Sequence, residues 1–286
     1  MWNPFNRNTI SNSSASKRSL QLITQKGMPF AYVEAYKALH TNLNFLSGSG
    51  DVHAFVVTST VPEEAKSNVS VNLALALTES GKKVVLVDCD LRKPVLHRYL
   101  KAGHNLKGVS NVLSRQVALS DALVELKDIP NLTFLPAGTT PPNPSELLSQ
   151  PQMQEMVDTL RGSYDFVILD APPISMVTDA AVIGRIVDGA LFVVRSKYAS
   201  TDAVKTALEK LQDAGVKVLG AVLTRYDAKK SLKRSDYGYG YYYYNSNYSY
   251  GPPDGISESA AKKSGLTSKK QHNGKEKHSV HTEDEA

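Results

Sequence analysis

Residues 57–67 read V-T-S-T-V-P-E-E-A-K-S, and this stretch decides the fold. The apolar run that ends at Ser59 is typical of a buried strand, and a helical pattern begins at the lysine. A strand, a turn that carries Lys-Ser and a helix together have the order of a phosphate-binding loop, or P-loop. Backbone N–H groups and the helix dipole favour an anion at a helix start, so the stretch predicts a polyphosphate site.

Two side chains of this loop have the chemistry that a nucleotide needs. Lys66 is placed to reach the β- and γ-phosphates, and the Ser67 hydroxyl is placed to hold Mg²⁺. We expect the nucleotide to be bound by ten consecutive residues: Ser59, Thr60, Val61, Pro62, Glu63, Glu64, Ala65, Lys66, Ser67 and Asn68.

The loop departs from the consensus just before the lysine. Ala65 stands where glycine is required, and Glu63 and Glu64 stand where a second glycine is common. Glycine allows unusual φ angles and close backbone approach. An alanine is therefore tolerated if φ is negative, and two glutamates repel a polyphosphate unless they point away. The loop fails the motif by itself, so its interpretation depends on the strands that follow.

Two further apolar strands end in carboxylates. One ends at Asp88, with Asp90 two residues later, and another ends at Asp170. Ligands bind beyond the carboxyl ends of strands in open α/β sheets. A single Asp would more simply cap a turn, but three carboxylates beside Lys66 and Ser67 predict a metal site. We assign Ser67, Asp88, Asp90 and Asp170 to Mg²⁺, with Asp170 acting through water.

Other charged residues near the strand ends leave alternatives open. Arg92 and Lys93 would either neutralise a transferring phosphoryl group or belong to a solvated loop, and Arg195 has the same two interpretations. The histidines and cysteine show no spacing typical of a zinc site.

Short β-rich runs alternate with helical patterns, which predicts an α/β fold of the P-loop NTPase class with a mostly parallel sheet flanked by helices. Strands are expected at residues 54–59, 84–88, 132–136, 166–170, 190–195 and 216–223. Helices are expected at residues 32–45, 67–80, 152–161, 178–187 and 202–214, and a loop at residues 138–144.

Composition divides the 286-residue chain into three parts. We expect a flexible segment over residues 1–30, the nucleotide-binding domain over residues 31–228 and a disordered tail over residues 229–286. The single cysteine fits a reducing compartment, and we expect no signal peptide and no membrane span. The net charge of +5 favours solubility over attraction to a membrane, and no basic-aromatic groove indicates nucleic acid.

Residues 237–250 read Y-G-Y-G-Y-Y-Y-Y-N-S-N-Y-S-Y, with no aliphatic side chain to bury. By itself this run could be a low-complexity, prion-like segment. Beside a phosphate-donor site it is better explained as a set of phosphoryl acceptors: Tyr237, Tyr239, Tyr241, Tyr242, Tyr243, Tyr244, Tyr248 and Tyr250.

The P-loop, the D-x-D strand, the L-D-A-P-P strand at residues 169–173 and the tyrosine-rich tail together resemble the bacterial tyrosine kinases (BY-kinases) of exopolysaccharide and capsule synthesis. The resemblance covers residues 31–250 and implies ATP/ADP and Mg²⁺ as ligands, with autophosphorylation of the tail. It implies that Lys66, Asp88 and Asp90 are catalytic, one aspartate accepting the phenolic proton.

The family often carries E-x-x-R-x-x-R in its first helix, which is used for ring-like self-association. The corresponding residues here are Glu34, Lys37 and His40, so a homo-oligomeric ring is expected, with a solvated helix face as the competing interpretation. The resemblance also implies a separate membrane-anchored polysaccharide co-polymerase as activator, a cognate tyrosine phosphatase, and a cytoplasmic, peripheral location at the inner membrane face.

Two other functions remain open. Ala65, Glu63 and Glu64 would also suit a degenerate P-loop pseudokinase or scaffold in polysaccharide assembly. ParA/MinD-type ATPases share the fold, but their signature lysine would fall at Val61, so valine there argues against them.

Overall fold

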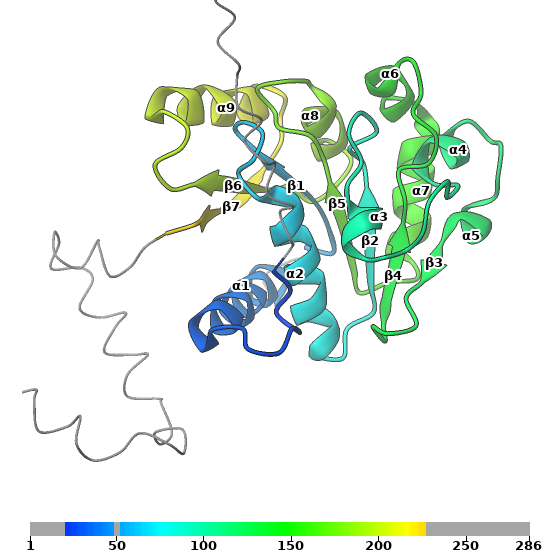
Figure 1. The fold of residues 1–286 in the computed structure, drawn as a ribbon. Helices are drawn as coiled ribbons and strands as arrows, with labels where there is room; N and C mark the ends of the chain where they lie inside the picture. The colour runs from blue at the N-terminus through cyan, green and yellow to red at the C-terminus, as the bar shows by residue number, and fades with distance from the viewer. Residues whose placement is uncertain (1–20, 49–51, 227–286) are drawn as a thin grey trace, which may run out of the picture. The chain divides into compact units, whose positions relative to one another are not determined.

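A seven-stranded sheet forms the centre of the computed structural model, which describes residues 21–48 and 52–226 (Figure 1). The strand order is β3-β4-β2-β5-β1-β6-β7, and every neighbouring pair is parallel except β3 and β4. The strands are β1 (Ala54–Ser59), β2 (Val84–Asp88), β3 (Val124–Glu125), β4 (Leu132–Leu135), β5 (Phe166–Asp170), β6 (Ala190–Arg195) and β7 (Val218–Thr224). The mostly parallel α/β fold that the sequence predicts is confirmed.

The helices that the sequence predicts are all present, with ends that differ by a few residues. They are α1 (Phe30–Gly48), α2 (Lys66–Glu79), α7 (Pro151–Arg161), α8 (Asp179–Gly184) and α9 (Thr201–Asp213). Four short helices and the strand β3 were not predicted, because four or five residues are too few to show a helical period. These helices are α3 (Leu96–Tyr99), α4 (Val109–Leu113), α5 (Leu119–Ala122) and α6 (Pro144–Leu148). The expected loop therefore ends one residue early, because Pro144 is the first residue of α6, where its fixed φ is tolerated.

Helices cover both faces of the sheet, and the central strands are buried on both sides. In β2, Val85 and Val87 pack in one apolar cluster, whereas Val84 and Leu86 pack in the other. This follows from the two-residue period of a strand. The first cluster includes residues of α7, α8 and α9, and the second includes residues of α1 and α2. The edge strand β7 is only partly buried.

The turns after α2 and α9 depend on glycine. Gly81 has φ 84° and Gly215 has φ 76°, directly after the C-cap residues Ser80 and Ala214. Glycine adopts this left-handed conformation without the steric penalty of a side chain. Both positions agree with the helix ends that the sequence predicts.

The sheet places the carboxyl ends of β1, β5 and β2 next to one another. Asp88 and Asp170 are register partners at the ends of β2 and β5, and the P-loop leaves the end of β1 between β5 and β6. The tyrosine cluster at residues 237–250 and the expected tail over residues 229–286 lie outside the described residues, as do residues 1–20 of the expected flexible segment. Residues 21–30 of that segment are described, with Ile23 buried and α1 beginning at Phe30. Among the described helices, none combines the length and the apolar character that crossing a membrane requires.

Candidate nucleotide and phosphoryl-transfer site

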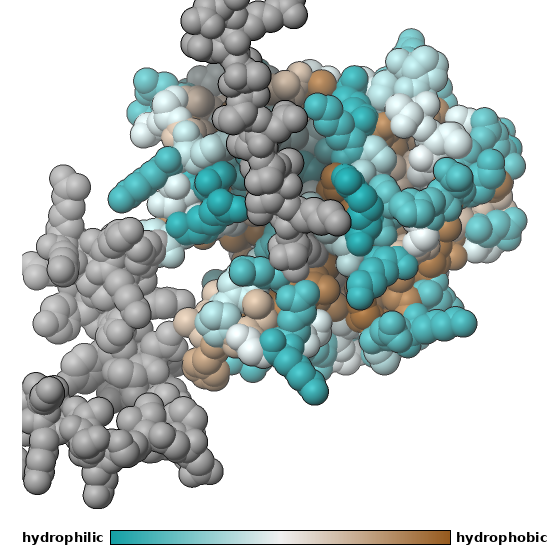
Figure 2. Space-filling model, viewed as in Figure 1, coloured by the Kyte–Doolittle hydropathy of each residue, from teal (hydrophilic) through white to brown (hydrophobic). Residues whose placement is uncertain are grey.

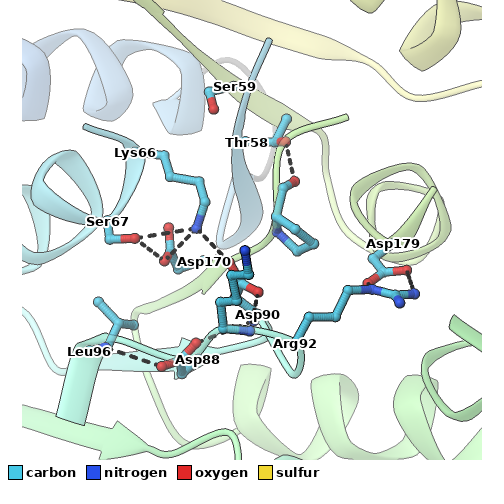
Figure 3. Close-up of polar contacts among 12 residues, drawn as sticks. Thr58, Ser59, Lys66, Ser67, Asp88, Asp90, Arg92, Leu96, Asp170 and Asp179 are labelled. Atoms are coloured by element: carbon cyan, nitrogen blue, oxygen red, sulfur yellow. Dashed lines mark hydrogen bonds and ion pairs between the residues drawn. The ribbon is translucent and has the colours of Figure 1, made fainter. Parts of the chain in front are cut away.

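Lys66 lies at the centre of a buried carboxylate cluster. Its Nζ is 3.2 Å from Asp170 Oδ2, 3.3 Å from Asp90 Oδ2 and 3.3 Å from Ser67 Oγ (Figure 3). Burial by itself lowers the pKa of Lys66, but attraction to Asp170, Asp90 and Asp88 outweighs burial and raises this pKa above its ordinary value. The ammonium group therefore stays charged, and without a nucleotide it neutralises the carboxylates.

Asp170, at the end of β5, also organises the start of α2. Its Oδ2 accepts a 2.6 Å hydrogen bond from Ser67 Oγ, and its Oδ1 accepts a 2.9 Å hydrogen bond from Ser70 Oγ. The sequence prediction missed Ser70, although its position three residues after Ser67 on one helix face was a signal. The first turn of α2 is thus fixed to the end of β5.

The two aspartates of the D-x-D motif have different surroundings. Asp88 is fully buried, and its carboxylate accepts hydrogen bonds from the N–H groups of Asp90 and Leu96, both at 3.2 Å. Desolvation, followed by repulsion from Asp170, raises its pKa to about 7. Asp90 retains some exposure, and its Oδ1 accepts a 3.0 Å hydrogen bond from the N–H of Lys93. Asp88 is the internal carboxylate, and Asp90 lies nearer to the surface.

The donor set of this cluster suits Mg²⁺. The Ser67 hydroxyl and the carboxylates of Asp90 and Asp170 are hard oxygen ligands that already lie around one point, the Lys66 ammonium. Mg²⁺ prefers such oxygens and keeps several waters. The residues fit the metal that the sequence predicts.

The P-loop backbone has a conformation that the sequence interpretation treated as unfavourable. Ala65 has φ 71° and Glu63 has φ 69°, both in the left-handed region. The condition set for an alanine in place of glycine, a negative φ, is not met. Non-glycine residues have a steric cost in this region, so the residues on both sides of Glu64 are strained.

The side chain of Glu64 points into the protein and not toward a phosphate. It is 1% exposed, and its carboxylate accepts hydrogen bonds from the N–H groups of Val61 at 2.9 Å and Arg195 at 3.2 Å. The repulsion expected from this glutamate is therefore reduced by two N–H donors. The Arg195 guanidinium stacks 4.3 Å from the ring centroid of Tyr198 and donates to the Glu63 carbonyl at 3.4 Å.

The remaining predicted loop residues are held by neighbouring elements. Ser59 Oγ donates to the Val61 carbonyl at 3.0 Å, and the Thr60 carbonyl accepts a hydrogen bond from the Ser175 N–H at 3.3 Å. Pro62 is exposed. Asn68 faces α1, because its Oδ1 accepts hydrogen bonds from the hydroxyls of two tyrosines, Tyr32 at 3.0 Å and Tyr36 at 3.1 Å.

Arg92 is engaged in an ion pair that the sequence did not reveal. Its Nε lies 3.0 Å from Oδ2 of the fully buried Asp179 (Figure 3). Its second terminal nitrogen lies 2.8 Å from Ser145 Oγ. This contact links the loop after β2 to α6 and α8. Arg92 and Lys93 are both exposed, as residues of a solvated loop would be, and the ion pair to Asp179 was not among the expected roles of Arg92.

The predicted self-association residues lie on α1, away from this cluster in sequence. Lys37 Nζ pairs with Glu34 Oε1 at 2.8 Å, and His40 Nε2 lies 2.8 Å from Asn44 Nδ2. The side chains of Lys37 and Glu34 are 55% and 35% exposed.

Figure 2 shows mostly hydrophilic side chains on the face in view, with hydrophobic patches between them.

Comparisons with known proteins agree with this geometry. A family model described as an AAA domain matches residues 64–218. The tyrosine-protein kinase YwqD of Bacillus subtilis is 37% identical over 205 residues, which cover 72% of this chain and 84% of the relative. The crystal structure of the chimerical protein CapA2B2 has a TM-score of 0.67 and 34% identity, and the match covers 73% of this chain and 90% of that one.

A more distant structure was solved with a nucleotide. The septum site-determining protein MinD of Pyrococcus horikoshii, complexed with Mg-ADP, has a TM-score of 0.53 and 26% identity, and the match covers 64% of this chain and 72% of that one. The fold of this chain is therefore also that of a protein that binds Mg-ADP.

Proposed function

Because this chain belongs to the family of bacterial tyrosine-protein kinases of capsule and exopolysaccharide synthesis, we propose that it transfers the γ-phosphoryl group of ATP to tyrosines of its own C-terminal segment. The acceptors are the tyrosines of residues 237–250. The observation that carries the proposal is the convergence of Lys66, Ser67, Asp90 and Asp170 at the carboxyl ends of three neighbouring strands.

In the proposed reaction, the chain mainly positions charge. Lys66 would leave its carboxylate partners and pair with the β- and γ-phosphates, while Ser67 and Asp170 would hold the metal. Mg²⁺, when bound, neutralises charge on the phosphate oxygens. The tyrosine oxygen forms a bond to the γ-phosphorus as the bond to the β-phosphate oxygen breaks, and ADP leaves.

The phenolic proton needs an acceptor, because the pKa of a tyrosine hydroxyl is about 10. We assign Asp90 as the acceptor and Asp88 as the residue that positions it. Asp88 accepts hydrogen bonds from the N–H groups of Asp90 and Leu96 and is fully buried, whereas Asp90 keeps some solvent exposure. Either aspartate would satisfy the family resemblance, and this geometry supports the division of roles.

The regulatory part of the proposal extends beyond the domain. Several phosphates on one segment would add roughly −1.5 to −2 charges each and repel it from the acidic site. We propose that this charge ends each cycle of phosphorylation and loosens a ring formed through α1. A phosphatase then removes the phosphate groups. A membrane-anchored activator would hold the chain at the inner face of the membrane.

A transfer assay tests the proposed function. Purified full-length chain is incubated with Mg²⁺ and γ-labelled ATP, and phosphotyrosine is mapped by mass spectrometry. Lys66→Met should lose label by at least 100-fold, and Tyr→Phe replacement across residues 237–250 should remove the acceptors. Lys37→Met, an exposed lysine on α1, is the matched control and should label in cis like wild type at a dilution where the chain is monomeric.

The second candidate is a nucleotide-binding scaffold without transfer, and the positive φ of Ala65 favours it. The two functions separate by experiment. A chain that binds Mg-ADP but places no label on any tyrosine, with or without Ala65→Gly, would contradict the kinase and support the scaffold.

A further inference from the structure

Glu64 is the feature of the P-loop that the proposed transfer mechanism does not use. A buried glutamate beside a polyphosphate site should weaken nucleotide binding by repulsion. Here, however, the carboxylate is placed between two backbone donors, with Oε2 at 2.9 Å from the Val61 nitrogen and Oε1 at 3.2 Å from the Arg195 nitrogen. The side chain thus bridges the start of the P-loop to the end of β6.

The backbone of the same residue makes a second bridge. The Glu64 carbonyl accepts a 2.9 Å hydrogen bond from Oγ1 of Thr224, the last residue of β7. Arg195 and Thr224 are register partners at the ends of β6 and β7. One loop residue therefore contacts the ends of both strands, and the chain passes from Thr224 toward the tyrosine-bearing segment.

The conformation of the loop explains why such a bridge is needed. Glu63 and Ala65, on either side of Glu64, both have positive φ without being glycine. Such residues persist only where surrounding contacts over-determine the backbone. The hydrogen bonds of Glu64 supply these contacts from inside the loop, and the N–H of Val61 is satisfied by the carboxylate rather than by a ligand.

We propose that Glu64 is a positioning residue that holds the P-loop in its phosphate-binding shape and ties it to the ends of β6 and β7 at Arg195 and Thr224. The inference rests on the proposed nucleotide site and adds the reason why a loop without glycine at residue 65 keeps this shape. The negative charge of Glu64 interacts with backbone N–H groups of the protein, and Glu64 therefore increases nucleotide affinity.

Repulsion of phosphate by Glu64 and positioning of the loop by Glu64 predict opposite changes in Mg-ADP affinity, so one substitution distinguishes them. Glu64→Gln removes the negative charge but leaves an amide that cannot accept both N–H groups. If the glutamate mainly repels phosphate, Mg-ADP should bind more tightly to this variant. If it positions the loop, binding should weaken by about ten-fold, the expected loss for a hydrogen bond to a charged group.

The experiment measures Mg-ADP affinity by calorimetry for the full chain and four variants. Glu64→Gln and Glu64→Asp, which retains the charge but shortens the reach, should both weaken binding. Thr224→Val, which removes only the bond to the Glu64 carbonyl, should weaken it by about three-fold, and the exposed control Glu209→Gln should match wild type.

Transfer to tyrosine is then measured on the same samples. Under this inference KM for ATP rises more than kcat falls. Unchanged or tighter Mg-ADP binding by the Glu64→Gln variant would overturn the inference, even if this variant is less stable than wild type. A wild-type chain that binds Mg-ADP but transfers no phosphate would contradict the kinase and leave the role of Glu64 intact. A wild-type chain that binds no nucleotide would contradict both.

Discussion

Lys66 and Lys37 show what the same side chain does in two regions of one domain. Lys66 is largely enclosed and lies 3.2–3.3 Å from two carboxylates that have little or no solvent exposure. Lys37 is 55% exposed and pairs with one glutamate on the same helix turn. Ion pairs in water contribute little to stability, whereas removing one partner of a buried group leaves uncompensated charge. The strand edge should therefore respond strongly to substitutions that α1 tolerates.

The largest effect should come from Lys66→Met. In the ligand-free chain this change leaves Asp88, Asp90 and Asp170 without their cation, so the free energy of unfolding should fall by roughly 3 kcal/mol. The same substitution at Lys37 should change it by less than about 0.5 kcal/mol. Urea unfolding with EDTA at pH 8 measures both values. Equal losses at the two lysines would show that the carboxylate cluster does not depend on Lys66.

The residues of this cluster were within reach of sequence analysis because each of them follows a strand. Asp88 and Asp170 are the last residues of their strands, and Lys66 is the first residue of the helix that follows β1. A parallel sheet brings these strand ends to one edge. Their convergence was predictable from local motifs. Their present bonding was not, since a lysine expected to contact phosphate instead neutralises carboxylates in the ligand-free chain.

The contacts that sequence analysis missed join segments far apart in the chain. Arg92 and Asp179 are separated by 87 residues, and Glu64 and Arg195 by 131. No local pattern pairs such residues. The sequence left the sign of the Ala65 φ open for a related reason, because intrinsic preference favours a negative φ and the contacts from β6 and β7 reach the neighbouring residue Glu64.

Measuring stability over a range of pH tests whether the buried carboxyl group of Asp88 has a raised pKa. Asp88 has a pKa of about 7 in the folded chain against 3.8 ordinarily, so between these values the folded state holds a proton that the unfolded state has lost. This stabilisation is complete below about pH 4 and is lost as the pH rises through 7. The free energy of unfolding of wild type, minus that of Asp88→Asn, should fall by roughly 2–3 kcal/mol from pH 5 to pH 8.

The measurement is urea unfolding in EDTA, with both proteins followed at each pH. Subtracting the Asp88→Asn curve removes the contribution of the histidines and isolates the carboxyl group. A difference that stays level or rises with pH would contradict the raised pKa.

A smaller effect, of opposite sign in the two regions, is expected from alanine to glycine substitutions. Ala65 pays for a φ of 71°, so Ala65→Gly should stabilise the chain by about 0.5–1 kcal/mol and tighten Mg-ADP binding. Ala35, an exposed residue of α1 with helical φ, should lose about 1 kcal/mol on the same change. Thermal unfolding and calorimetry measure these values, and a loss of stability at both positions would show that the loop is not strained.

The smallest change in stability should follow from removing the ion pair between Glu34 and Lys37 on α1. The same variant tests whether this helix face takes part in self-association. Glu34→Ala with Lys37→Ala removes an exposed pair that contributes roughly 0.2–0.5 kcal/mol. The side chains lie on an accessible helix face, so any larger effect must come from contacts between copies of the chain. Light scattering over a range of concentrations should show weaker self-association in the double variant than in Lys127→Ala, an exposed lysine outside α1. If both variants associate like wild type while their unfolding curves coincide, the α1 face is solvated and any self-association uses another surface.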